Sequence, residues 1–192
     1  AMFQTLKQLW APRQSLPMQT IRAHYARIVA SARKPVLFQA LAVPDTVDGR
    51  FDCLVLHMHL WLRALASSQT APPTLSQQLF DLFLTDMDHN LRELGVSDLR
   101  VGPQVKSMAK GYYGRATAYD AALDSGDDGA LEAALRRNLY GALLEPPPDT
   151  AVTAMVRYIR SVSAHLAAQD FTDVPEPPPP PALSTDGTGE GS

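Results

Sequence analysis

The segment from 51 to 66 is apolar on almost every side, and this feature limits most strongly how the 192-residue chain can fold. At about 100° per residue, its few polar groups fall on one narrow line along a helix, and they are Asp52, His59 and Arg63. A helix that is apolar all round is stable only when other elements surround it. The sequence therefore predicts a buried central helix with a single polar line.

Helical periodicity also fills most of the chain on both sides of this segment. Apolar residues recur at spacings of three and four in 17–33, in 75–94, in a segment that opens at Pro103, and in two segments with Asp127 and Asp149 as predicted N-caps. Sustained alternation of apolar and polar residues, the pattern of a half-buried strand, does not occur. We therefore predict an all-α fold, with a single helical domain of about six or seven helices.

The two ends of the chain differ in composition from this predicted helical domain, which spans 17–170. Residues 1–16 form a basic segment that can continue the helical pattern. Residues 171–192 contain a run of prolines at 177–181 and end in a Gly-, Ser- and Thr-rich stretch, a composition that cannot bury a core. We expect 171–192 to be a disordered tail.

Charge is distributed unevenly, although the net charge is only −3. The first 44 residues carry six basic side chains and no acid, and the first acidic residue is Asp45. This basic part could dock on an anionic surface such as a ribosome or a phospholipid membrane, or it could pair with the acidic half of the same molecule. The whole chain lacks the charge of a nucleic-acid binder, so we expect no DNA binding.

Motifs for catalysis and cofactor binding are missing from the sequence, which has no phosphate loop, no dinucleotide fingerprint and no nucleophile elbow. We therefore expect neither an enzyme nor a bound cofactor. One alternative stays open, a metal-dependent helical enzyme in which Asp86, His89 and Glu93 share one helix face and hold the metal. A second acidic motif of the kind that such enzymes need is not present. Haem binding by His57, His59, Met58 or Met87 competes with ordinary packing of these residues in the core.

The helix predicted after Pro103 has one side of small residues. Gly111 and Gly114 each cost about 1 kcal/mol relative to alanine inside a helix, so a compensating interaction is expected. By helical angle, the small residues gather opposite Tyr112 and Tyr119, and they are Ser107, Gly111, Gly114, Ala118 and Ala121. Two interpretations remain: tight packing inside the molecule, or a groove that receives a helix of another protein.

Several of these segments together resemble a known family. They are H-M-H-L-W-L-R at 57–63, the run 80–98 with D-M-D-H-N-L-R-E-L-G at 86–95, and 108–123 with G-R-A-T-A-Y-D at 114–120. The chain is similar over about residues 20–165 to the ubiquinol-cytochrome c chaperone family. Because no long presequence precedes the predicted helices, the resemblance is to a bacterial member.

The resemblance implies an all-helical assembly factor for the cytochrome bc1 complex that binds newly made cytochrome b. Such a factor would work in the cytoplasm at the cytoplasmic face of the inner membrane, and a second, smaller assembly factor accompanies the mitochondrial relatives. A structural subunit that stays in a respiratory complex is a further alternative. We expect the partner-binding patch to comprise Asp86, Asp88, Asn90, Arg92, Glu93, Tyr112, Tyr113, Arg115 and Tyr119.

Overall fold

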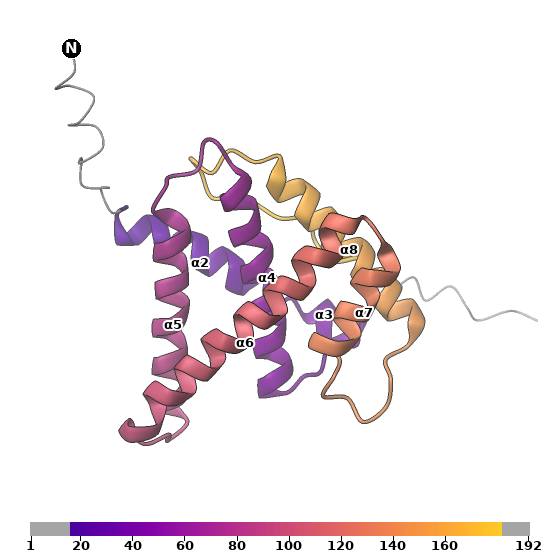
Figure 1. Cartoon of the computed structure of the whole chain (residues 1–192), viewed down its shortest axis with the longest axis horizontal. Helices are drawn as coiled ribbons and strands as arrows, with labels where there is room; N and C mark the ends of the chain where they lie inside the picture. The colour runs from indigo at the N-terminus through magenta and orange to yellow at the C-terminus, as the bar shows by residue number, and fades with distance from the viewer. Residues whose placement is uncertain (1–15, 182–192) are drawn as a thin grey trace, which may run out of the picture.

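The structure, a computed structural model, describes residues 16–181 and contains seven helices and no strand within that range (Figure 1). The predicted all-α fold is therefore confirmed. In chain order the helices are α2 (Met18–Ala32), α3 (Pro35–Gln39), α4 (Val47–Ser67), α5 (Leu75–Glu93), α6 (Asp98–Ser125), α7 (Asp128–Asn138) and α8 (Asp149–Ala167). None of the helices in this range is long and apolar enough to cross a membrane.

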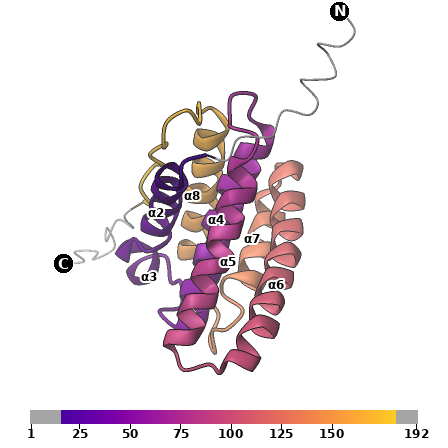
Figure 2. The ribbon, with the colours of Figure 1, turned by 90° about the vertical axis from the view of Figure 1, so that its left-hand side faces the viewer.

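Helix α4 is the centre of the domain, as predicted. Every residue from Cys53 to Trp61 is buried. Helices α2, α5, α6 and α8 all pack directly on α4, and the neighbours also pack on one another in the order α2, α5, α6, α7, α8. The helices thus form an incomplete ring around α4, which is open between α8 and α2 (Figures 1 and 2).

The C-terminal segment, which we define as residues 171–181, closes this opening. It follows α8 as an irregular chain and runs beside α2 and α8 on the side of the bundle opposite α6 (Figure 2). Phe171 is buried in the core, and Pro175, Pro177 and Pro180 are buried as well. The predicted start of a disordered tail at residue 171 is therefore too early, because one aromatic side chain anchors the prolines that follow it. The rest of the predicted tail, from 182, and the predicted basic segment up to residue 15 lie outside the described residues.

Three helix starts differ from the sequence prediction. Helix α4 begins four residues earlier than predicted, because the Thr46 hydroxyl accepts a hydrogen bond from the Gly49 N–H (3.1 Å) and caps it. Helix α6 begins at Asp98 and contains Pro103, and its first turn is held in place by the buried Val101. Pro148 occupies the N-cap position predicted for Asp149. Two other signals are confirmed, since Asp127 caps α7 and Gly95 follows α5 with a positive φ.

Two glycines make a matched test of this packing. A Cβ on Gly49 would lie 2.1 Å from the carbonyl oxygen of Pro44, whereas a Cβ on Gly114 would have nothing within 4 Å. We expect Gly49→Ala to lower the free energy of unfolding by about 1–3 kcal/mol, because the backbone must move apart. We expect Gly114→Ala to raise it by up to about 1 kcal/mol, because alanine favours an exposed helix interior. Urea unfolding measures both, and an unchanged stability of Gly49→Ala would show that Pro44 does not lie against α4.

Candidate functional site

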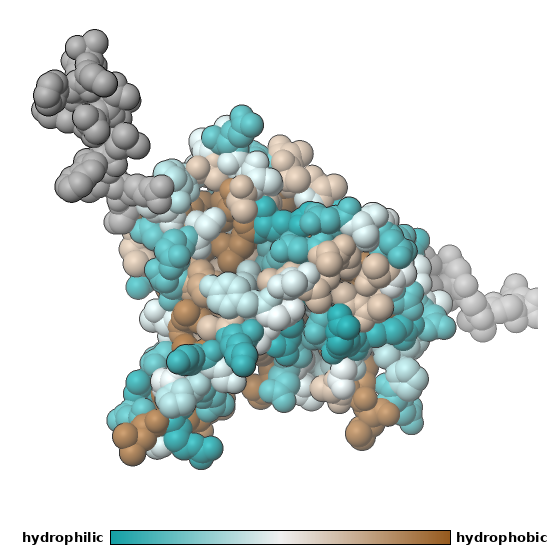
Figure 3. Space-filling view, in the orientation of Figure 1, coloured by the Kyte–Doolittle hydropathy of each residue, from teal (hydrophilic) through white to brown (hydrophobic). Residues whose placement is uncertain are grey.

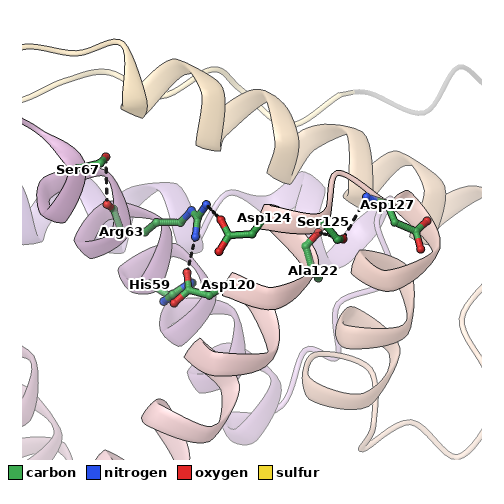
Figure 4. A network of polar contacts seen from close by, with 8 residues as sticks. All are labelled: His59, Arg63, Ser67, Asp120, Ala122, Asp124, Ser125 and Asp127. Atoms are coloured by element: carbon green, nitrogen blue, oxygen red, sulfur yellow. Dashed lines mark hydrogen bonds and ion pairs between the residues drawn. The ribbon is translucent and has the colours of Figure 1, made fainter.

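The polar line of α4 faces α6 and meets charged residues there. Arg115 and Asp52 form an ion pair (Nη2 to Oδ1, 2.7 Å), and Nε2 of His59 lies 3.1 Å from Oδ1 of Asp120. Arg63 donates from Nη1 to the same Asp120 oxygen (2.7 Å) and from Nη2 to Asp124. Figure 4 shows His59 and Arg63 pointing from α4 toward the two aspartates of α6. We call this set the polar interface; its members are Asp52, His59, Arg63, Arg115, Asp120 and Asp124.

Aromatic rings fill the middle of the polar interface. The ring of His59 lies 6.4 Å from that of Tyr112 and 6.1 Å from that of Tyr119, measured between centroids. Both tyrosines are buried, so these two members of the predicted binding patch belong to the core. Any part that they have in partner binding would act through the position of α6 and not through direct contact.

Burial sets the protonation of the polar interface. It raises the pKa of Asp52 to about 6, and the neighbouring positive charge of Arg115 opposes this rise. Burial lowers the pKa of His59, and the Asp120 carboxylate opposes that change. The hydrogen bond to Asp124 raises the pKa of Arg63. The interface therefore holds the ion pairs of Arg63 at the end of α4 and, at its start, a carboxyl group whose pKa is raised to about 6.

A cleft opens where α4 begins and α5 ends. It consists of two adjoining cavities of about 320 Å³ and about 750 Å³, which share the same apolar wall. We call it the terminal cleft; the shared wall is made of Val47, Phe51, Leu91, Leu94 and Met108. Val47 is 69% exposed and Leu94 is 67% exposed, so the apolar wall continues onto the outer surface. Figure 3 shows hydrophobic surface at the lower edge of the molecule, where α5 meets α6.

The predicted binding patch separates into four parts in the structure, and the buried pair Tyr112 and Tyr119 is one of them. Asn90 and Glu93 line the smaller cavity of the terminal cleft, and Arg115 lines the larger one. Asp86 accepts a hydrogen bond from the Tyr25 hydroxyl (2.7 Å) and so ties α5 to α2. The terminal cleft therefore brings together three of the nine residues of the predicted binding patch. That these residues bind a partner remains a prediction.

The other three patch residues lie on the outer surfaces of α5 and α6. Arg92 pairs with Asp88 one turn earlier (2.7 Å) and with Asp98 at the start of α6, which fixes the corner between the two helices. Tyr113 is 60% exposed, and its ring packs against Phe80 (5.6 Å between centroids). Tyr113 is thus the aromatic patch residue that a partner can reach directly.

The side of small residues on α6 does not pack inside the described part of the molecule. A Cβ on Gly114 would meet no atom within 4 Å, and one on Gly111 would meet only the guanidinium of Arg115 (2.9 Å). The interpretation as tight internal packing is therefore wrong. Ser107 and Gly111 line the terminal cleft. Reception of a helix on this side remains a prediction.

The metal-site alternative has no geometric support between residues 16 and 181. No three His, Cys, Asp or Glu side chains in this range gather closely enough to hold a metal ion. Asp86 is bound to Tyr25, whereas His89 pairs with Glu93 (3.2 Å) on the surface. His57, a candidate for haem, instead donates to the carbonyl of Cys53 (2.8 Å) and accepts from the Tyr158 hydroxyl (3.0 Å).

Two residues of the wall of the terminal cleft, Val47 and Leu94, were not among the predicted binding residues. Val47 and Leu94 are apolar residues at helix ends, next to Thr46 and Gly95. Helix ends bury less of a side chain than helix centres, so an apolar residue beside a cap or a turn is a signal for exposed apolar surface. That signal is present in the sequence. It does not reveal that the start of α4 and the end of α5 lie side by side.

Comparison with known proteins gives two matches. The family model described as ubiquinol-cytochrome C chaperone matches residues 39–174. The crystal structure of the Cbp3 homolog from Brucella abortus is similar with a TM-score of 0.67 and 33% sequence identity, over 88% of this chain and 89% of that one. No curated protein matches the chain. The family match spans the polar interface and the terminal cleft.

The raised pKa of Asp52 predicts a pH dependence with a definite sign. Because the folded state holds the proton of Asp52 more tightly than the unfolded state, this group favours folding at pH 4, and that contribution is lost as the pH rises through about 6. Relative to Asp52→Asn, the wild type should therefore lose about 2 kcal/mol of unfolding free energy between pH 4 and pH 7. Urea unfolding at several pH values measures the difference. A parallel pH dependence of the two proteins would contradict the burial of this carboxyl group.

Proposed function

Because the chain belongs to the ubiquinol-cytochrome C chaperone family, we propose that it promotes assembly of the cytochrome bc1 complex by binding newly made cytochrome b. In this proposal the protein acts by binding alone and performs no catalytic step. The observation that supports it most directly is the terminal cleft, where an apolar wall and several polar residues line two adjoining cavities at one end of the bundle.

The chemistry of the terminal cleft suits an unassembled membrane protein. Cytochrome b exposes apolar helices until its partners and the membrane cover them, so a chaperone needs a surface that holds apolar segments without requiring one sequence. Met87 and Met108 line the cleft, and flexible methionine side chains adapt to different apolar shapes. Val47 and Leu94 on the rim extend the contact beyond the cavities.

Polar groups at the terminal cleft would orient the bound segment. Asn90 and Glu93 stand on one side and Arg115 on the other, and the small residues Ser107 and Gly111 allow the backbone of a helix to approach α6 closely. We propose that these residues, with the exposed Tyr113, form the part of the predicted patch that contacts the client.

The basic N-terminal part would bring the protein to the place of synthesis. Arg22 on α2 and Arg33 directly after it are exposed, and the described chain carries no acidic residue before Asp45. We propose that this part docks on a ribosome or on the cytoplasmic face of the inner membrane through anionic groups. Arg27 lies nearby but is paired with Glu176 of the C-terminal segment.

The assembly role predicts a selective loss of one haem signal. In a strain of the source bacterium without this gene, the reduced-minus-oxidised spectrum of the membranes should lose the b-type and c-type signals of the bc1 complex. Other cytochromes should remain, and a plasmid copy of the gene should restore the lost signals. Full bc1 activity in the deletion strain would contradict the assembly role.

Site-specific crosslinking tests the location of the client. A photo-crosslinking amino acid at Leu94 should capture newly made cytochrome b, because Leu94 stands on the rim of the terminal cleft. The same amino acid at Met18, which is 53% exposed on α2, serves as the matched control and should capture at least fivefold less. Equal capture at both positions would show that the client does not enter the cleft, even if the assembly role itself is correct.

A further inference from the structure

The opening in the helix ring is closed by a segment that forms no regular structure. Helix α2 packs on α4 and α5, and helix α8 packs on α4 and α7, so the C-terminal segment lies where a further helix would complete the ring (Figure 2). Within residues 16–181, no hydrogen bond joins the backbone of 171–181 to the backbone of another element. Every residue from 177 to 181 is a proline, and proline has no backbone N–H group. This composition alone limits the number of such hydrogen bonds.

One aromatic side chain anchors the C-terminal segment. Phe171 is 1% exposed, and its ring stacks on His24 of α2 (6.4 Å between centroids) and meets the edge of Trp61 of α4 (6.1 Å). The ion pair of Glu176 with Arg27 holds the segment further along α2. Three of the prolines are buried too, but the segment is held by side-chain packing and one surface ion pair and by no backbone hydrogen bond to another element, which is typical of an element that opens while the helices stay folded.

The pocket around Phe171 contains two polar atoms that Phe171 cannot satisfy. Nδ1 of His24 and Nε1 of Trp61 are buried, and neither has a hydrogen-bond partner among residues 16–181. Their side chains are only 1% and 2% exposed. Buried polar groups in native proteins are paired in the great majority of cases, and an unpaired one is costly. The pocket is therefore a better match for an aromatic ring that carries a hydrogen-bonding group than for phenylalanine.

A hydroxyl group on the ring has the chemistry to pair with either atom. The indole Nε1–H is a donor only, whereas a tyrosine hydroxyl can accept from it and donate to an imidazole nitrogen at the same time. Burial lowers the pKa of His24, so its ring is neutral at neutral pH and one of its nitrogens can accept.

We propose that the groove under residues 171–181 is an exchangeable binding site, which the C-terminal segment occupies until an extended segment of a partner protein replaces it. The partner segment carries a tyrosine in the place of Phe171, followed by prolines that lie along α2. This site is separate from the terminal cleft and does not depend on the identity of the client.

A peptide with the chain's own sequence is the probe for this exchange. A fluorescein-labelled peptide of residues 170–181 is added to the full-length variant Phe171→Ala, in which the pocket is vacated, and to the wild type, in which it is filled. We expect the peptide to bind the variant at least tenfold more tightly than the wild type. A peptide with Phe171→Tyr should bind the variant about fivefold more tightly than the unchanged peptide, as one additional hydrogen bond predicts. A peptide with Phe171→Ala is the negative control.

The expected results separate exchange from a fixed structural role. If the folded Phe171→Ala variant binds neither peptide, or if the tyrosine peptide has no advantage, the proposal is wrong. Should that variant fail to fold, Arg27→Ala loosens the segment without changing the pocket, and it must then bind the tyrosine peptide more tightly than the wild type does. Hydrogen exchange gives an independent check in the unmodified protein. The amides of 171–174 must exchange far faster than those of α4, and equal protection would overturn the proposal.

Discussion

Helix α4 dictates the architecture because it has almost no side that can face water. Every residue from Cys53 to Trp61 is buried, and burial of that surface requires neighbours in all directions. Helices supply most of these neighbours and the C-terminal segment supplies the last. The position of each other element therefore follows from which part of α4 it covers.

The polar line of α4 determines where α6 lies and where the surface opens. Long charged side chains stand between the two helices at both ends of the line, while compact aromatic rings fill the middle. The helices therefore leave a cavity at each end. The terminal cleft has an apolar wall that reaches the outer surface at Val47 and Leu94, although charged residues also line its larger cavity. The cavity of about 740 Å³ at the other end is lined by apolar residues as well as by Arg63, Asp124 and Arg160. The charges of Arg63 and Arg160 are paired within the protein, since Arg63 binds Asp124 and Arg160 binds Asp128.

Periodicity along the chain was sufficient to predict the central helix and the existence of its polar line, because both depend only on spacing within one helix. Of the two interpretations of His57, the structure shows packing in the core, where its ring bonds to Cys53 and Tyr158. Periodicity could not predict that Asp86 binds Tyr25, or that Arg115 reaches Asp52, because these pairs join residues more than 60 positions apart. The prediction that the disordered tail begins at residue 171 was wrong for a related reason. Composition describes an average over many residues, whereas a single phenylalanine decides whether the prolines after it are held against the bundle.

The segments that carry the family resemblance gain a physical meaning from the polar interface. His59 and Arg63 lie in the segment at 57–63, and Tyr119 and Asp120 lie in the segment at 114–120. The two segments contact each other through these residues, where α4 packs on α6. Much of the family resemblance therefore lies in the residues through which α4 packs on α6. Residues that form such a joint are expected in any protein with this fold, whatever it binds. The features that distinguish one member from another should lie where the joint ends, in the apolar wall of the terminal cleft and in the segment that covers His24 and Trp61, because these surfaces can change without disturbing the pairing of α4 with α6.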